Sequence, residues 1–444
     1  MCGAGIAGIS TAFHLVRCGI DDVLIVDSRP PLSLTSDKST ECYRDWWPTR
    51  PMFQLMSRSI ELLERYALES ADAFHLGRRG YLFATAHQDR LAALARSAHT
   101  TEQMGGGELR VYLGDAGDPT YRPAARDGWE DEPSGVDLFM DGDVLRRWFP
   151  SLTEDAVGGV HIRRAGWLSA QQLGSWMLDE CQAADVEPIH DEVVAVDTSG
   201  GRVRSVTLSS GKRINTDVFI NAAGPLLDHV ANLVGARLPV HSEMHQKIAF
   251  RDHLIGFPRD APMLIWCDPQ HLAWTDEESA ALHDAGRLDL LGLLPGLCHG
   301  RPEGGEDSLW ALGLWELRPE VRSPTWPLPE NPIYPEVVLR GLASMLPALS
   351  GYHDRLPETL VDGGYYTKTI ENMPLVGPLG PRGSFVCGAL SGFGIMAACG
   401  VGELAALHVS GGPLPPYGSD FRVERYEDPA YLDSVAADTD SGQL

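Results

Sequence analysis

The chain of 444 residues lacks several features that would identify its class at once. It contains no run of about 18 apolar residues, which a membrane-spanning helix requires. Its N-terminal region has neither the basic segment nor the cleavage site of a secretory signal. Its eight cysteines are scattered, with no C-x-x-C pair and no Cys/His spacing suited to zinc. We therefore predict a cytoplasmic protein with reduced thiols, without a membrane span and without a bound metal.

Basic residues are also scarce. Lysine and arginine together number 36, against 61 aspartates and glutamates, so the formal net charge is -25. A charge of this sign repels phosphate backbones and anionic lipid surfaces, and we expect no nucleic-acid or membrane partner. The length predicts two domains, or one large domain with insertions.

Glycine, in contrast, is concentrated at the very start, in Gly3-Ala4-Gly5-Ile6-Ala7-Gly8. This G-x-G-x-x-G spacing is typical of a strand-to-helix turn that places a dinucleotide pyrophosphate at the helix N-terminus. Helical periodicity follows over 9–16, and a short buried strand over 23–26 ends at an acid suited to a ribose hydroxyl. We predict nucleotide contacts at Gly3, Gly5, Ile6, Ala7, Gly8, Asp27 and Ser28.

One part of this motif is short. A strand should precede the first glycine, and strands usually span about 5–6 residues, but only Met1 and Cys2 stand before Gly3. We therefore expect this edge of the sheet to be incomplete. Without a ligand, the same segment would be only a glycine-rich turn between a strand and a helix.

A segment rich in hydroxyl side chains runs from Leu34 to Pro48. Small polar residues suit a loop that wraps phosphate groups, although a solvated loop that caps the next helix would look similar. We predict ligand contacts at Thr35, Ser36, Ser39 and Thr40.

Two later segments place small residues where strands end. The strand 218–221 ends in an Ala-Ala-Gly sequence, and a glycine-containing segment after the strand 384–388 opens a helix. Backbone N–H groups at such positions meet ligands because no bulky side chain covers them. We predict contacts here at Ala223, Gly224, Gly392, Phe393, Gly394, Ile395 and Met396. A hairpin is predicted over 193–208.

The remaining chain predicts a second, mostly antiparallel sheet. Alternating segments between 240 and 360 indicate strands, whereas two polar stretches, 102–136 and 267–307, are predicted to be surface insertions. The acidic segment 433–444 is expected to be a frayed tail.

Together these blocks resemble the D-amino-acid oxidase superfamily of FAD-dependent enzymes. The resemblance is carried by Gly3–Gly8 with Asp27, by Thr35–Arg44, by Asn221–Pro225, and by Met373–Gly377 with Gly388–Gly394. Within the superfamily the chain is most similar to the branch of glycine oxidase, sarcosine oxidase and dimethylglycine dehydrogenase.

The resemblance implies an α/β fold. A Rossmann-like FAD-binding domain (1–80, 141–236 and 361–432) would carry an inserted substrate domain with a mixed or antiparallel sheet (81–140 and 237–360). FAD would lie extended, with its adenine end at the first glycines and at the strand that begins at Val193, and its isoalloxazine near Gly392.

The resemblance also implies a reaction. Family members oxidise a C–N bond of an amino acid or N-methylated amine by hydride transfer to flavin N5, and pass the electrons to oxygen or a carrier. His245, in a His-Gln pair, matches a histidine that faces the substrate amine, Arg44 matches an arginine near the substrate carboxylate, and Tyr366 would cover the pocket. The structural alternatives are a core histidine, a surface ion pair and aromatic packing.

Three departures from the family pattern concern substrate and cofactor. Met396 stands where sarcosine oxidase has a carboxylate-binding lysine, and Trp274 stands where the tyrosine partner of the histidine is expected. Other branches attach flavin covalently through a histidine near Lys38 or a cysteine near Gly364. Neither is present, so we expect non-covalent FAD.

Other classes of protein share the first glycine motif. A flavin monooxygenase would carry a Gly-Asp pair late in the chain, where this sequence has Gly388–Gly392. A disulfide reductase would need a second glycine motif and a redox-active cysteine pair, and both are missing. A flavin-binding protein without catalysis remains an alternative.

Overall fold

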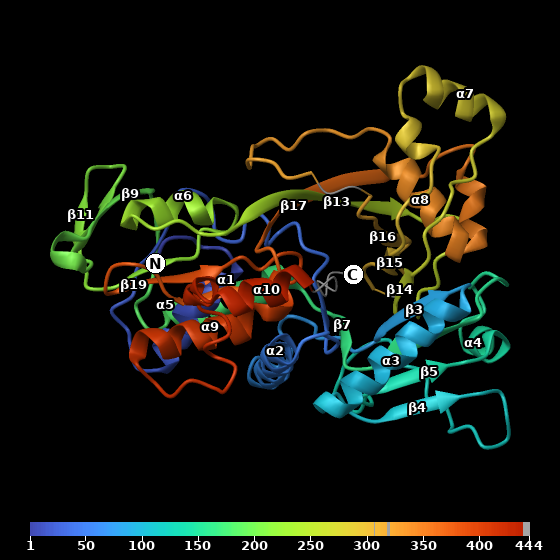
Figure 1. Ribbon diagram of the computed structural model, residues 1–444, viewed down its shortest axis with the longest axis horizontal. Helices are drawn as coiled ribbons and strands as arrows, with labels where there is room; N and C mark the ends of the chain where they lie inside the picture. Colours follow the sequence, from blue (N-terminus) through green and yellow to red (C-terminus); the bar gives the residue numbers. More distant parts are fainter. Residues whose placement is uncertain (306, 318–319, 438–444) are drawn as a thin grey trace.

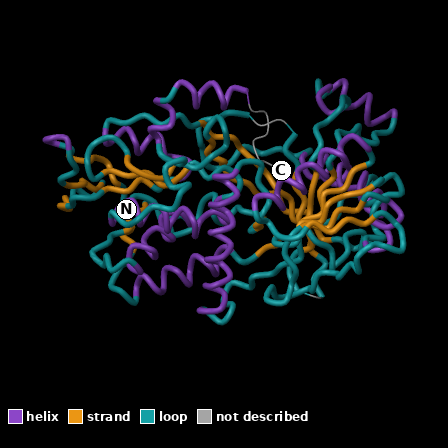
Figure 2. Tube along the Cα trace, turned by 60° about the horizontal axis from the view of Figure 1, so that its bottom comes forward, coloured by secondary structure: helices purple, strands orange, loops and turns teal. Residues whose placement is uncertain are grey.

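The computed structural model describes residues 1–305, 307–317 and 320–437. It has two lobes, one around the N-terminus and one built on a large sheet (Figure 1). Figure 2 shows the strands gathered in two groups, one in each lobe. We call them the nucleotide lobe and the sheet lobe.

The nucleotide lobe is built on a mostly parallel sheet. Its strands are β1 (Ile25–Asp27), β8 (Pro188–His190), β12 (Phe219–Asn221), β18 (Leu375–Pro378) and β19 (Ser384–Gly388). β1 pairs with β8, and β12 pairs with β19, which pairs with β18; only the last pairing is antiparallel.

The first two residues join these two groups of strands. Cys2 forms parallel bridges with both Val26 and Asn221, and its backbone N–H donates to the Ile220 carbonyl at 2.9 Å. We expected Met1 and Cys2 to form an incomplete edge of the sheet. This is wrong, because Cys2 lies inside the sheet, between β1 and β12. Paired on both sides, even this short segment anchors the turn that follows.

Long helices cover this sheet and pack against one another in one apolar core. They are α1 (Ile6–Arg17), α2 (Arg50–Glu69), α5 (Ala170–Gln182) and α9 (Gly394–Ser410). Ser169, the residue before α5, accepts a hydrogen bond from the backbone N–H of Gln172 through its side chain, as expected for an N-cap.

Smaller elements complete this lobe. An antiparallel three-stranded sheet contains the predicted hairpin, and a two-stranded ladder connects the lobes. These elements are β9 (Val193–Asp197), β10 (Ser205–Leu208), β11 (Arg213–Asn215), β2 (Cys42–Arg44), β7 (Ala165–Trp167), α6 (Leu227–Ala231) and α10 (Pro429–Ala437).

The sheet lobe contains a mixed, nine-stranded sheet in the order β17-β13-β16-β15-β14-β3-β6-β5-β4. In chain order the strands are β3 (Tyr81–Thr85), β4 (Leu109–Tyr112), β5 (Val136–Phe139), β6 (Gly158–Ile162), β13 (His241–Arg251), β14 (Met263–Trp266), β15 (Cys298–Pro302), β16 (Trp310–Leu314) and β17 (Thr359–Lys368). The pairs β14–β3 and β4–β5 are parallel, and the others are antiparallel.

The two faces of this sheet have different partners. One face packs on α8 (Tyr334–Met345) and α4 (Gly142–Trp148), and part of the other on α3 (Gln88–Met104). A further helix, α7 (Asp276–Asp284), lies at the periphery in Figure 1. The unshielded part of the second face is turned toward the nucleotide lobe.

Three sequence-based boundaries need correction. The stretch 102–136 supplies β4, and 267–307 supplies β15, which lies between β14 and β16, so neither is only a surface insertion. β6 and most of β17 fall within the bounds expected for the FAD-binding domain, but β6 pairs with β3 and β5, and β17 pairs with β13. β15 escaped notice because Gly300, Arg301 and Pro302 are poor strand formers; Arg301 is buried and donates to the carbonyl of Thr40.

The tail is partly ordered. α10 reaches Ala437, so the first residues of the predicted frayed segment 433–444 are helical, and 438–444 lie outside the described residues. Among the helices that the structure describes, none has the length and apolar character that crossing a membrane demands.

Candidate functional site

The glycine turn lies at one end of a narrow cleft between α1, β1, β12 and α9. Gly3 has φ +112°, and a Cβ there would lie 2.3 Å from the carbonyl oxygen of Ala222. A Cβ on Gly8 would lie 2.0 Å from the carbonyl oxygen of Gly3. Because neither position tolerates a side chain, the turn brings bare backbone N–H groups and the α1 N-terminus to the cleft.

Asp27, at the end of β1, braces this turn. Its Oδ2 accepts from the Ala4 backbone N–H at 2.8 Å, and its Oδ1 accepts from the Arg29 N–H at 2.9 Å. Each carboxylate oxygen retains acceptor capacity, and Asp27 and Ser28 both line the cleft. The position suits an acid that holds a ribose.

The hydroxyl-rich loop closes the cleft from the other side. Ser36 Oγ accepts from the Ile6 N–H at 3.0 Å, and Thr35 Oγ1 donates to the Tyr365 carbonyl at 3.1 Å. The loop therefore lies directly over the helix N-terminus, where an anion would be held.

Most predicted cofactor contacts meet in this one cleft. Its lining includes Gly3, Gly5, Ile6, Ala7, Asp27, Ser28, Thr35, Ser36, Ser39, Val193, Ala223, Gly224, Gly392, Gly394 and Ile395. Gly8 lies behind the turn, whereas Thr40, Phe393 and Met396 line a different and larger cavity.

The larger cavity holds about 1160 Å³ and lies between the lobes. Gly392 and Tyr366 line both the cleft and the cavity, so the two spaces meet there. A cofactor extended along the cleft from the glycine turn would reach the cavity at this junction.

One face of the nine-stranded sheet forms the cavity floor. Residues directly opposite one another on paired strands share a face. The register connects Phe83 to Ile265, Ile265 to His299, His299 to Leu314, and Leu314 to Lys247. This row crosses β3, β14, β15, β16 and β13 without a break, and side chains two positions away belong to the same floor.

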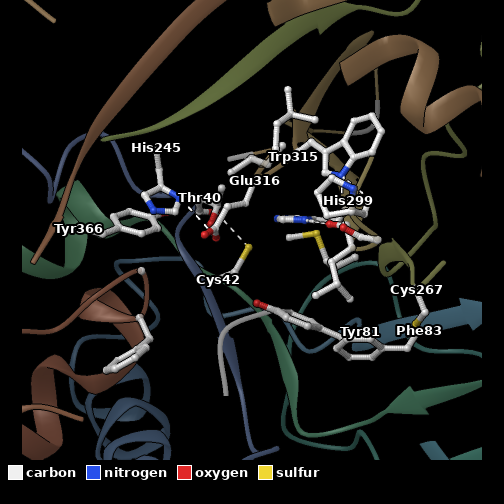
Figure 3. Close-up of a pocket in the computed structure, with 18 of the residues that line it drawn as sticks. Thr40, Cys42, Tyr81, Phe83, His245, Cys267, His299, Trp315, Glu316 and Tyr366 are labelled. Carbon is white, nitrogen blue, oxygen red and sulfur yellow. Dashed lines mark hydrogen bonds and ion pairs between the residues drawn. The ribbon is translucent and has the colours of Figure 1, made fainter. Parts of the chain in front are cut away.

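His245 lies on this floor beside Glu316 (Figure 3) and belongs to a cluster of charged side chains. Its Nε2 is 3.2 Å from Glu243 Oε2, and its Nδ1 is 3.6 Å from Glu316 Oε2. The Lys368 ammonium is 2.6 Å from Glu243 and 3.9 Å from Glu316. Burial alone would raise the pKa of Glu243, but hydrogen bonds from His245 and Lys368 outweigh it and lower that pKa to about 2.

The other two predicted catalytic residues also line the cavity. The Tyr366 ring stacks on the imidazole of His245. Arg44 is buried at 5% exposure, and its guanidinium carbon lies 4.7 Å from the centroid of the Trp47 ring. The surface ion-pair alternative for Arg44 is therefore wrong.

Sequence reasoning missed Glu243, Glu316 and Lys368. Strand alternation carried a signal for them, because Glu243 stands two residues from His245 and Lys368 two residues from Tyr366. Glu316 stands two residues beyond Leu314, the last residue of β16, so the alternation of side chains along that strand places both on the same face. Trp274, in contrast, does not line the cavity; its Nε1 donates to the Leu290 carbonyl at 3.0 Å.

The cluster also has the geometry of a metal site. Ligand atoms of Glu243, His245 and Glu316 all lie within 4.8 Å of one another. Lys368, however, already contributes a cation beside Glu243, which partly balances the charge of the two carboxylates.

Comparisons with known proteins agree with this geometry. The family model described as FAD dependent oxidoreductase (DAO) matches residues 2–407. No curated protein sequence matches the chain significantly.

Solved structures show the same fold at low sequence identity. L-proline dehydrogenase from P. horikoshii superimposes with a TM-score of 0.71 at 17% identity, covering 98% of this chain and 96% of that one. Glycine oxidase from Geobacillus kaustophilus gives 0.70 at 15%, covering 95% and 96%. Iminodiacetate oxidase from Chelativorans sp. gives 0.69 at 19%, covering 95% and 98%.

The cleft combines a glycine turn, a helix N-terminus and the carboxylate of Asp27, and the family model spans most of the chain. The chain belongs to the DAO family of FAD-dependent oxidoreductases.

Proposed function

We propose that the protein oxidises the C–N bond of an amino acid or N-substituted amine to an imine. The observation that carries this proposal is the junction at Gly392 and Tyr366, where the cofactor cleft opens into a cavity beside the His245–Glu316 pair. When bound, FAD would supply the hydride acceptor at its isoalloxazine N5.

We assign FAD binding to the nucleotide lobe and substrate binding to the sheet lobe. The glycine turn would hold the pyrophosphate, Asp27 the ribose, and the residues around Gly392 the isoalloxazine, without a covalent bond. The elongated cleft that connects all three supports this arrangement.

Glu316 would hold the substrate ammonium. Its side chain is 31% exposed and lines the cavity, whereas Glu243 is 11% exposed and is already paired with Lys368. A carboxylate on the cavity wall attracts a protonated amine and keeps its nitrogen in one place.

His245 would accept the proton that the ammonium must lose before oxidation, because only a neutral amine has the electron pair that stabilises the developing imine. Its imidazole lies between Glu316 and Glu243, within reach of an ammonium held at Glu316. Tyr366 would hold the ring in orientation by stacking, and Arg44 would bind a substrate carboxylate.

The structural relatives support the choice of amine chemistry. Three of them are named L-proline dehydrogenase, glycine oxidase and iminodiacetate oxidase. Each of these names refers to an amino acid or an imino acid.

The test is anaerobic reduction of the flavin in the purified holoprotein by a panel of D-amino acids, L-amino acids and N-alkyl glycines. We expect at least one compound to bleach the oxidised flavin and to yield the corresponding carbonyl product after imine hydrolysis. Readmission of air then separates an oxidase, which reoxidises quickly, from a dehydrogenase. Flavin that no amine reduces, although dithionite does, would contradict the proposal.

A further inference from the structure

The cavity is much larger than the reacting part of an amino acid requires. Pockets for small organic ligands usually hold about 300–1,000 Å³, and this one holds about 1160 Å³. The charged cluster around His245 occupies only one end of it (Figure 3). An isoalloxazine at the Gly392 junction would fill part of this volume, and the part beyond it is available to the rest of a substrate.

The opposite end is apolar. Figure 3 shows Tyr81, Phe83 and Cys267 on the far side of the cavity from His245 and Tyr366. We call this end the apolar chamber; its side chains come from β3, from β14, and from segments beside them. They are Trp46, Tyr81, Phe83, Leu94, Met263, Cys267 and Leu297.

The order of the strands sets the distance between the charged cluster and the apolar chamber. β13, which carries His245, and β3, which carries Phe83, are separated by β16, β15 and β14. At about 4.8 Å per strand, the far wall lies roughly 19 Å across the sheet from the charged cluster. The β14 residue Met263 lies one strand nearer.

None of the side chains that form the apolar chamber is charged at neutral pH, but Arg44 also lines the cavity, within electrostatic range of Tyr81 and His299. Burial raises the pKa of the Cys267 thiol to about 12, so the thiol stays protonated at neutral pH. Midway across the floor, burial lowers the pKa of His299 to about 4, so its imidazole stays neutral.

Arginines near this end are already paired. Arg90 Nε lies 3.5 Å from Asp268, and Arg287 Nε donates to Asp289 at 3.0 Å. Neither offers an unneutralised cation to a second acidic group of a ligand. A largely apolar wall of this kind favours apolar ligand surface.

We propose that the substrate is an amine whose nitrogen or α-carbon carries a long apolar group ending in a ring, which lies in the apolar chamber. This inference rests on the proposed amine oxidation at the other end of the cavity. The amine lies at Glu316, the chain crosses the floor past His299, and the ring packs against Met263, which lies on β14, two strands or about 10 Å from β16.

The experiment compares two secondary amines with the same reacting centre, N-methylglycine and N-(4-phenylbutyl)glycine, on the unmodified holoprotein. Binding is measured calorimetrically under anaerobic conditions, and flavin reduction is followed separately by absorbance. Each buried methylene strengthens binding by about fourfold. We expect the phenylbutyl compound to bind at least about 30-fold more tightly.

A pair of variants at one position locates the ring. Leu297→Trp fills the chamber and should weaken binding of the phenylbutyl compound by at least about tenfold, while binding of N-methylglycine changes less than about twofold. Leu297→Met keeps the volume and should leave both compounds within about twofold of the unmodified protein. Both variants are checked for FAD content.

The two readouts separate the two proposals. Equal binding of the two amines overturns the chamber proposal, whatever the flavin does. Tight, Leu297-sensitive binding without flavin reduction supports the chamber and overturns amine oxidation. Tight binding with reduction supports both.

Discussion

The ring of Tyr366 stacks on the imidazole of His245, with centroids 4.0 Å apart and planes inclined by 16°. Tyr366 also lines the cofactor cleft, so one side chain connects the cleft to the charged cluster. This contact limits rotation of the imidazole and keeps its two nitrogens directed at Glu243 and Glu316.

Replacing His245 should slow flavin reduction more than it weakens FAD binding. His245→Ala removes the proton acceptor, and loss of a positioned acid–base group typically slows a reaction by about 10²–10⁴-fold. Asp27→Ala should have the opposite pattern of effects, because it removes a carboxylate that supports the glycine turn rather than a group beside the substrate. It should weaken FAD binding by about 10–100-fold, the loss expected for hydrogen bonds to a charged group.

Single-turnover reduction at saturating amine, together with titration of apoprotein with FAD, distinguishes the two effects. If His245→Ala reduces its flavin at the normal rate, the histidine has only a structural role.

Glu316→Gln should raise the amine concentration needed for half-maximal flavin reduction by about 10–100-fold, since a charge-assisted hydrogen bond contributes about 1.5–3 kcal/mol. The reduction rate at saturation should change much less. Glu320→Gln is the control, because Glu320 also lines the cavity but is exposed and pairs with Arg322. Equal effects of the two substitutions would show that Glu316 has no specific role in binding the substrate amine.

Glu243 should make the stability of the protein depend on pH in acid. Its pKa lies at about 2 in the folded protein, against 4.5 ordinarily. Its stabilising contribution is therefore complete above about pH 4.5 and is lost as the pH falls toward 2. Glu243→Gln should unfold more easily than the unmodified protein by about 1–3 kcal/mol at pH 6, and the difference should shrink steadily below pH 4.5.

Urea unfolding at a series of pH values measures this difference. Glu358→Gln is the control, because its ion pair with Arg251 is exposed and should contribute little at any pH. A Glu243→Gln difference that does not vary with pH would show that its charge is not involved.

FAD should leave the protein on denaturation. The position of Gly364 carries no side chain, and its surroundings are Thr35 and the aliphatic part of Lys38 rather than a nucleophile suited to attachment. Acid precipitation should leave the flavin in the supernatant. Yellow fluorescence that migrates with the chain in denaturing electrophoresis would contradict this prediction.

Sequence alone determined the features that depend on neighbours along the chain. The glycine turn, its helix and the acid at Asp27 are set by local backbone requirements, because Gly3 and Gly8 occupy positions where any Cβ would collide with a carbonyl. The Ser169 cap and the hairpin of β9 and β10 depend on equally local chemistry. The family resemblance rests on these blocks, and the family model confirms it.

Only the tertiary structure decided the site. Glu316, His245 and Phe83 lie far apart in sequence and share one floor through the register of five adjacent strands. No local pattern specifies which strands become neighbours, and β15 has glycine and proline where a strand former would be expected. Its pairing arises because β14 and β16 satisfy its backbone on both sides, and long-range hydrogen bonding of this kind outweighs local propensity.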